Sequence, residues 1–208
     1  MHQSLFITLE GCEGVGKSTA LSFIEFFLEE KKIDFILTRE PGGTAIGEVI
    51  RNILLHHDDE SITPMTELLL MFAARAQHIA HVIKPALKAG KIVVSDRFTD
   101  SSFAYQGGGR EIPAEKLQTL TEWVQGDLEP NLTLLLDAPV ALGMSRISSR
   151  GGLDRIEREK IEFFERIRQA YLTRAKQFPK RFVVVDATQS VEHVQTQIAA
   201  ALSALMDH

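Results

Sequence analysis

The chain has 208 residues, of which 44% are hydrophobic and 25% are charged. This length predicts one domain whose core is large enough to fold without staples, and a single cysteine excludes an internal disulfide. The 23 basic and 28 acidic residues give a net charge of −5, which argues against nucleic acid as a partner.

The compartment is predicted from the same composition. A lone cysteine fits a reducing cytoplasm. The segment Met1–Ser4 has no basic region ahead of a long apolar run, so we expect no secretory signal. No apolar stretch approaches the roughly 20 residues that a membrane span needs, so we expect no membrane partner.

Five short runs of consecutive apolar residues predict five β-strands. The runs are continuous rather than alternating, which is typical of strands buried on both faces of a parallel sheet. They are Leu5–Leu9, Phe35–Leu37, Ile92–Ser95, Leu132–Leu136 and Phe182–Val185.

Segments with the apolar spacing of helices separate these runs. The predicted helices are Lys17–Glu30, Met65–Leu87 (with Pro85 kinking or ending it), Pro113–Gly126, Ala141–Ser149, Arg158–Gln177 and Val191–Met206. Strands that alternate with helices predict right-handed βαβ units. We therefore expect residues 1–208 to form a single α/β domain, a three-layer α/β/α fold around a five-stranded parallel sheet.

A phosphate-binding motif lies between the first strand and the first helix. It reads Gly11-Cys12-Glu13-Gly14-Val15-Gly16-Lys17-Ser18 and is followed by Thr19. The glycines let backbone N–H groups turn toward phosphate oxygens, while Lys17 can reach the β- and γ-phosphates and the Ser18 hydroxyl can bind Mg²⁺. The N-terminus of the following helix favours the same anion. The motif predicts a nucleoside triphosphate site, and in this strand–loop–helix context it predicts that the α/β/α domain has the P-loop NTPase-like fold.

Two residues of this motif need their own explanation. A carboxylate at Glu13 would repel triphosphate oxygens, so it either points to solvent or faces a second substrate that offers a hydroxyl. Cys12 is expected to be a small buried hydrophobic residue rather than a redox group. A GTPase is excluded, because neither Asn52 nor Asn131 begins the Asn-Lys-x-Asp motif that reads guanine.

Arginines at the carboxyl ends of two strands indicate a second phosphate site. Arg39 follows the second strand, and Asp96 and Arg97 follow the third, so all three are expected beside the phosphate loop. Two arginines there can hold a phosphate by charge-assisted hydrogen bonds, and Asp96 can hold Mg²⁺ or its waters. The alternative is that Arg39 and Arg97 only pair with Glu40 and Asp96 on a solvated surface.

Two further segments carry candidate residues. Phe72 offers a face on which a base can stack, and Arg75 lies on the same side of the helix, although Phe72 can equally be core packing. Arg146, Arg150, Asp154 and Arg155 surround Gly151-Gly152, which is typical either of a lid over about 149–158 or of a charged surface loop. The histidine pairs His56-His57 and His78/His81 are expected to be solvated surface rather than metal ligands.

These motifs together resemble the bacterial type of the thymidylate kinase family. The resemblance covers nearly the whole chain and rests on Glu10–Thr19, Thr38–Thr44, Phe72–Arg75, Ser95–Phe98, Ala104–Arg110, Leu153–Glu157 and Asp186–Thr188. It implies phosphoryl transfer from ATP, bound with Mg²⁺, to the 5′-phosphate of dTMP, which gives dTDP and ADP. It also implies a homodimer formed through the long helices.

The resemblance implies roles for the acceptor-side residues. Glu13 would face the deoxyribose 3′-hydroxyl, and Arg39 and Arg97 would hold the acceptor phosphate. Tyr105 would lie close to C2′ and disfavour a ribonucleotide. Around the base, Phe72 would stack on thymine and Arg75 would bond O4, and the other implied neighbours of the base are Leu54, Ser102 and Gln106.

The resemblance also implies the donor side. Arg146 and the segment Ala187–Gln189 would flank the adenine of ATP. Gly14 occupies the position where some relatives carry a loop arginine, so Arg150 or Arg155 would have to supply the catalytic charge from the lid, unless Arg155 pairs with a neighbouring carboxylate.

Two alternatives remain at this point. A deoxynucleoside kinase would phosphorylate a sugar hydroxyl and would need no second phosphate site, so Arg39 with Arg97 argues against it. A nucleotide-binding regulator without catalysis would be expected to lack Lys17 or the lid arginines, and the chain has both.

Overall fold

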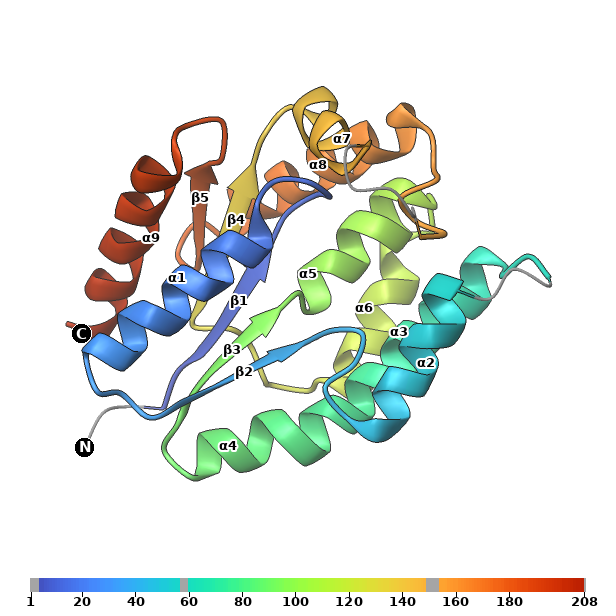
Figure 1. Ribbon diagram of the computed structural model, residues 1–208. Helices are drawn as coiled ribbons and strands as arrows, with labels where there is room; N and C mark the ends of the chain where they lie inside the picture. The colour runs from blue at the N-terminus through green and yellow to red at the C-terminus, as the bar shows by residue number, and fades with distance from the viewer. Residues whose placement is uncertain (1–3, 57–59, 149–153, 208) are drawn as a thin grey trace.

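The computed structural model describes residues 4–56, 60–148 and 154–207, and a five-stranded parallel sheet lies at its centre (Figure 1). The strand order is β2-β3-β1-β4-β5, and each neighbouring pair is parallel. The strands are β1 Phe6–Glu10, β2 Phe35–Arg39, β3 Ile92–Asp96, β4 Leu132–Asp137 and β5 Phe182–Asp186. The five strand predictions and the α/β class are confirmed.

Helices cover both faces of the sheet. They are α1 Lys17–Glu30, α2 Ala45–His56, α3 Pro64–His78, α4 Lys84–Lys88, α5 Thr99–Ser102, α6 Ala114–Val124, α7 Val140–Ser148, α8 Ile161–Gln177 and α9 Val191–Met206. There are also two π-helical segments. The first, η1 Ile79–Ile83, connects α3 to α4, and the second, η2 Phe103–Gly109, follows α5. Among the described residues, we find no helix that is long and apolar enough to cross a membrane.

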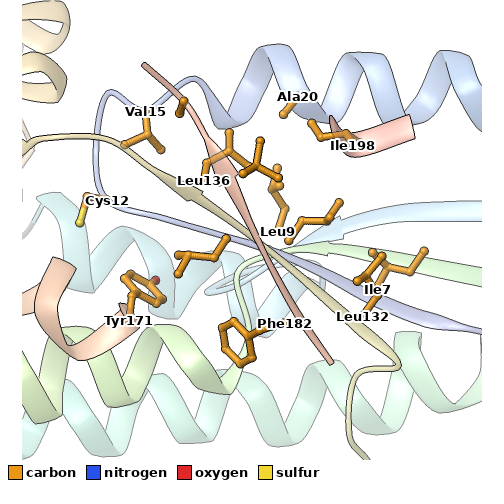
Figure 2. Packing of buried hydrophobic residues seen from close by; sticks show 14 of the residues in the cluster. Ile7, Leu9, Cys12, Val15, Ala20, Leu132, Leu136, Tyr171, Phe182 and Ile198 are labelled. Carbon is orange, nitrogen blue, oxygen red and sulfur yellow. The ribbon is translucent and has the colours of Figure 1, made fainter. Parts of the chain in front are cut away.

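The layers follow from the alternation of side chains along β1. Ile7 and Leu9 pack into the largest core cluster, which includes Ala20 of α1 and Ile198 of α9 (Figure 2). Phe6 points to the opposite side and packs with Ile83 of η1 and other residues. Because successive side chains of a strand face opposite ways, one strand buries apolar surface against both helical layers.

The structure differs from the sequence prediction in two helical segments. The predicted helix Met65–Leu87 becomes α3, η1 and α4, in which the Lys84 N–H bonds back to the Ile79 carbonyl just before Pro85. Proline has no N–H and crowds the preceding turn, and a wider π turn accommodates it without ending the helix. Helix α2 was not predicted, although Thr44 accepts a hydrogen bond from the Gly47 N–H at its start.

Candidate active site

A cavity of about 490 Å³ opens at the carboxyl ends of β1, β2 and β3. In a parallel sheet this edge is where loops meet and ligands bind. Its wall combines the phosphate loop, the segments after β2 and β3, and parts of α2, α3 and η2. The predicted residues on the wall are Glu13, Gly14, Gly16, Lys17, Ser18, Thr19, Arg39, Arg75, Asp96, Arg97, Ser102, Tyr105 and Gln106.

The phosphate loop has backbone angles that favour glycine. Gly11, Gly14 and Gly16 have φ values of 144°, 71° and 95°. A Cβ on Gly14 would overlap the Gly143 carbonyl oxygen of α7, so this position has no room for a side chain. Lys17 Nζ lies 3.4 Å from the Gly11 oxygen and 3.3 Å from the Cys12 oxygen. Within Gly11–Ser18, Lys17 is thus the only basic side chain.

The thiol of Cys12 is buried beneath this loop. It faces the Phe164 carbonyl oxygen at 4.0 Å, and Figure 2 shows it within the apolar core. Burial raises the pKa of the Cys12 thiol to about 12, so the reactive thiolate is scarce at neutral pH. The structure thus favours the small-hydrophobic interpretation over the redox one.

The carboxylate of Glu13 faces the cavity. It accepts hydrogen bonds from Arg97 Nη2 and the Tyr105 hydroxyl, each at 2.8 Å. Burial raises the pKa of Glu13, but the charges of Arg97 and Lys17, together with the Tyr105 hydrogen bond, outweigh burial and hold this pKa at about 2. Glu13 is therefore a fixed anion on the wall, which favours the substrate-facing alternative over the solvent-facing one.

The two predicted acceptor arginines differ in their surroundings. Arg97 is half-buried, and its Nη1 donates to the Gly11 carbonyl oxygen at 2.9 Å. Arg39 is exposed and donates to Glu48 Oε2 at 2.8 Å. Neither has the partner that the surface alternative required, since Arg97 bonds Glu13 and Arg39 bonds Glu48. Both side chains line the same cavity as the phosphate loop.

Arg75 is fully buried, and its three nitrogens have different roles. Nε donates to Glu40 Oε2 at 2.7 Å, and Nη2 donates to the Phe98 carbonyl at 3.1 Å. Nη1 is buried and has no hydrogen-bond partner in the described part of the chain. Gln106 shows the same pattern: its Nε2 donates to Glu67 at 2.9 Å, while its Oε1 has no partner among residues 4–56, 60–148 and 154–207. We refer to Arg75 Nη1 and Gln106 Oε1 as the wall atoms.

Two residues implied for the base pocket lie behind the wall. Phe72 is 2% exposed and packs with Leu68 and Leu117, and its ring lies 4.7 Å from the Arg75 guanidinium. Leu54 is fully buried in a separate cluster. The neighbouring residues Met71 and Leu55 line the cavity instead. The structure therefore does not bring Phe72 and Leu54 to the surface of the cavity.

His78 was expected at the surface, and this was wrong. The ring is fully buried, with Nδ1 2.9 Å from Glu40 and Nε2 2.6 Å from the Thr38 hydroxyl. Glu40 follows β2 and accepts bonds from both His78 and Arg75, so it joins the two residues. A buried carboxylate needs such partners, and this requirement draws the histidine inward. His81 is exposed, as expected.

The predicted lid residues are partly described. Arg150 lies outside the described residues. Arg146 is exposed, and its Nη1 lies 3.3 Å from the Gly14 carbonyl oxygen. Arg155 donates to Glu67 Oε2 at 2.5 Å and to the Leu54 carbonyl at 2.8 Å. The partner of Arg155 is thus neither Asp154 nor Glu157, its neighbours in sequence. The Arg155 side chain instead pairs with Glu67, because a carboxylate that is only 1% exposed needs a cation.

Several residues of the site had not been singled out from the sequence. They are Glu10, Glu40, Glu67, Arg110 and Tyr171. Glu40, Glu67 and Tyr171 bond predicted residues directly. Glu10 and Arg110 in turn bond Tyr171 and Glu67. One signal was available. Glu67, Met71 and Arg75 are spaced by four residues on α3, so they share a helix face.

A phosphate loop and two arginines that line one cavity define a P-loop phosphotransferase with an acceptor that is itself phosphorylated. The comparisons with known proteins are more specific. A family model described as "Thymidylate kinase" matches residues 9–198. The chain belongs to the thymidylate kinase family, whose members transfer a phosphoryl group from ATP to dTMP.

Relatives match along nearly the full length. The chain is 53% identical to a thymidylate kinase of Pseudomonas putida (strain GB-1) over 203 residues, which cover 98% of this chain and 97% of the relative. It is 54% identical to that of Ruthia magnifica over 205 residues, covering 99% and 100%. A crystal structure of thymidylate kinase from Ehrlichia chaffeensis is 31% identical, with a TM-score of 0.78 and coverage of 97% and 99%.

Proposed function

We propose that this chain transfers the γ-phosphoryl group of ATP to the 5′-phosphate of dTMP, and that the wall atoms select the base. Arg75 Nη1 is a donor and Gln106 Oε1 is an acceptor, both atoms are buried without a partner among the described residues, and their two residues line the cavity that holds the phosphate loop. Thymine offers a matching pair, with O4 as acceptor and N3–H as donor. This complementarity is the observation that carries the assignment of the base.

The sugar and acceptor phosphate would bind between these wall atoms and the loop. Arg97 and Arg39 would hold the phosphate by charge-assisted hydrogen bonds. Glu13, fixed as an anion by Arg97, would accept from the 3′-hydroxyl, which removes the need for it to approach triphosphate oxygens. Tyr105 donates to Glu13 and would lie beside C2′. Binding of a phosphate at Arg97 would therefore compete with an ion pair already in place.

Phe72 is assigned a supporting role. Its ring packs against the Arg75 guanidinium and holds the plane that carries Nη1. Stacking of Phe72 on thymine, and packing of Leu54 against the base, stay predictions. Ser102 lines the cavity beside Gln106 and would lie near the base edge.

The residues present fit a magnesium ion that arrives with ATP. Asp96 Oδ1 is buried and has no hydrogen-bond partner within the described ranges, and Ser18 lines the same cavity. Carboxylate and hydroxyl oxygens are ligands that Mg²⁺ prefers. When bound, the ion would neutralise charge on the phosphate oxygens. The rest of the stabilisation is assigned to Lys17 and to Arg150, because Arg155 is held by Glu67.

A homodimer is proposed through α2 and α3, which lie side by side (Figure 1). Ile46, Val49 and Ile53 are 38–62% exposed and lie three and four residues apart on α2, and Met65 and Leu69 are exposed on α3. Such a stripe of apolar side chains on paired helices suits burial against a second copy. Val49→Glu should give a monomer in analytical ultracentrifugation, whereas the control Val191→Glu on α9 should not.

The compartment is proposed to be the cytoplasm, because the single cysteine is a free buried thiol.

The experiment that tests the activity measures ADP release with dTMP, dUMP, dCMP, thymidine or AMP as acceptor. We expect fast turnover with dTMP and none with thymidine, which carries no acceptor phosphate. Turnover with thymidine would favour a deoxynucleoside kinase. ATP binding without turnover on any acceptor would favour a nucleotide-binding regulator.

A further inference from the structure

A carboxylate that does not line the cavity lies directly behind Arg97. Glu10 is the last residue of β1 and is fully buried. Its Oε1 accepts from the Phe98 N–H at 2.8 Å. Its Oε2 accepts from the Ser101 hydroxyl at 2.6 Å and the Tyr171 hydroxyl at 2.9 Å. Every one of these three partners is next to Arg97 in sequence or in hydrogen-bond contact with it.

The backbone of Arg97 needs this support. Its φ is 70°, in a region that residues other than glycine rarely occupy. The Arg97 N–H donates to the Leu9 carbonyl at 2.9 Å, and the Ser95 hydroxyl donates to the Arg97 carbonyl at 2.7 Å. Glu10 fixes the next N–H along the chain, that of Phe98. Such a conformation persists only where its surroundings hold it, and here β1 does so from both sides.

The guanidinium of Arg97 is held by the same group of atoms. Its Nη1 lies 3.3 Å from Ser101 Oγ and 3.1 Å from the Tyr171 hydroxyl oxygen. These two oxygens are 2.7 Å apart, and both contact Glu10 Oε2. The three oxygens form a triangle with three short contacts, but the two hydroxyls supply only two hydrogens. A proton on Glu10 would supply the third.

We propose that Glu10 is a positioning residue for the acceptor phosphate, which fixes the Arg97 backbone through Phe98 and aims its guanidinium through Ser101 and Tyr171, and does so best when it carries a proton. The proposal rests on the proposed function, since it takes Arg97 as the acceptor-phosphate ligand. It adds that dTMP binding depends on the Glu10 carboxyl, although Glu10 does not line the cavity and would not contact dTMP.

The electrostatics of the triangle agree with this role. Burial raises the pKa of Glu10 to about 7, and the Asp100 carboxylate on α5 raises it too, while Ser101, Arg97 and Tyr171 oppose them. Glu10 therefore loses its proton nearer to neutral pH than an ordinary glutamate does. Charging removes the third hydrogen and adds a negative charge behind the arginine that must receive a phosphate. The KM for dTMP should rise as pH rises through 7.

The first test compares Glu10→Gln with the unaltered protein. An amide keeps an oxygen for the Phe98 N–H and presents hydrogens to Ser101 and Tyr171 at every pH. We expect the KM for dTMP of the unaltered protein to rise about 3- to 10-fold more than that of the variant between pH 6 and 8. The dTMP phosphate also titrates, with a pKa of about 6, but this changes the KM for dTMP of both proteins alike. Equal pH profiles would overturn the proposal.

The second test separates positioning from stability. Tyr171→Phe should raise the KM for dTMP about 3- to 10-fold at pH 6 and leave the KM for ATP unchanged. The matched control is Thr8→Val, which removes a different buried hydroxyl, one on β1 that pairs with Thr133 at 3.0 Å. Thr8→Val should lower the Tm without changing the KM for dTMP. Equal KM changes in both variants would overturn the proposal, whereas an unaltered protein without dTMP-dependent turnover would refute the proposed function.

Discussion

Replacing thymine by cytosine in the acceptor reverses both hydrogen-bonding partners of the wall atoms. Arg75 Nη1 would meet the 4-amino group, donor against donor, and Gln106 Oε1 would meet the unprotonated N3, acceptor against acceptor. Gln106 cannot turn its amide to adapt, because its Nε2 donates to the buried Glu67 at 2.9 Å. Each buried polar atom left unpaired costs about 1–3 kcal/mol. Two such atoms lower kcat/KM for dCMP by a factor on the order of 10²–10⁴ relative to dTMP.

The assay is kcat/KM for dTMP, dUMP and dCMP under identical ATP and Mg²⁺. dUMP keeps the imide edge and lacks only the methyl group, so it should lose about 10- to 200-fold. Gln106→Leu removes one wall atom and should reduce the ratio of kcat/KM for dTMP to that for dCMP by about tenfold or more. The matched control is Gln118→Leu on α6, an exposed glutamine that donates to Glu122. A dCMP efficiency close to that of dTMP would refute the reasoning about the wall atoms.

Four further predictions concern the cations of the phosphate loop, the acceptor site and the lid segment. Lys17→Ala should abolish transfer and leave the melting temperature nearly unchanged, and normal turnover would exclude the phosphate-loop assignment. Arg97→Ala should raise the KM for dTMP far more than that for ATP, with a loss of roughly 2–5 kcal/mol, and equal effects on both would contradict an acceptor-side role. Arg155→Ala should lower stability by about 1–3 kcal/mol in thermal melting, because it leaves the buried Glu67 with fewer partners. Arg150→Ala should lower turnover on the order of 10³-fold with little effect on ATP binding, and near-normal turnover would remove the lid from catalysis.

The elements that sequence predicted well are those with local signals. The continuous apolar runs identified the five strands, and the motif around Lys17 correctly placed a glycine-rich loop between β1 and α1, where it lines the cavity. Arg39 and Arg97 could be placed at one sheet edge because parallel strands align their carboxyl ends. Local pattern and topology were sufficient for these.

The residues that were missed depend on partners distant in sequence. Glu10 and Tyr171 are 161 positions apart, and Glu67 and Arg155 are 88 apart, so no local pattern pairs them. His78 carries no sequence mark that distinguishes a buried ring from a surface one, because its burial depends on the carboxylate after β2. Buried polar networks form through tertiary packing, and the periodicity of a single sequence does not show which distant residues pack together.

We propose that the phosphate loop and the acceptor-phosphate site act together on dTMP. The most direct measurement is chromatographic quantification of dTDP and ADP formed from ATP and dTMP by the purified protein with Mg²⁺. Lys17→Ala serves as the negative control for a contaminating kinase. We predict dTDP and ADP in equal amounts, both absent with the variant. Formation of ADP without dTDP, or of dTDP at the same rate by the variant, would contradict the account.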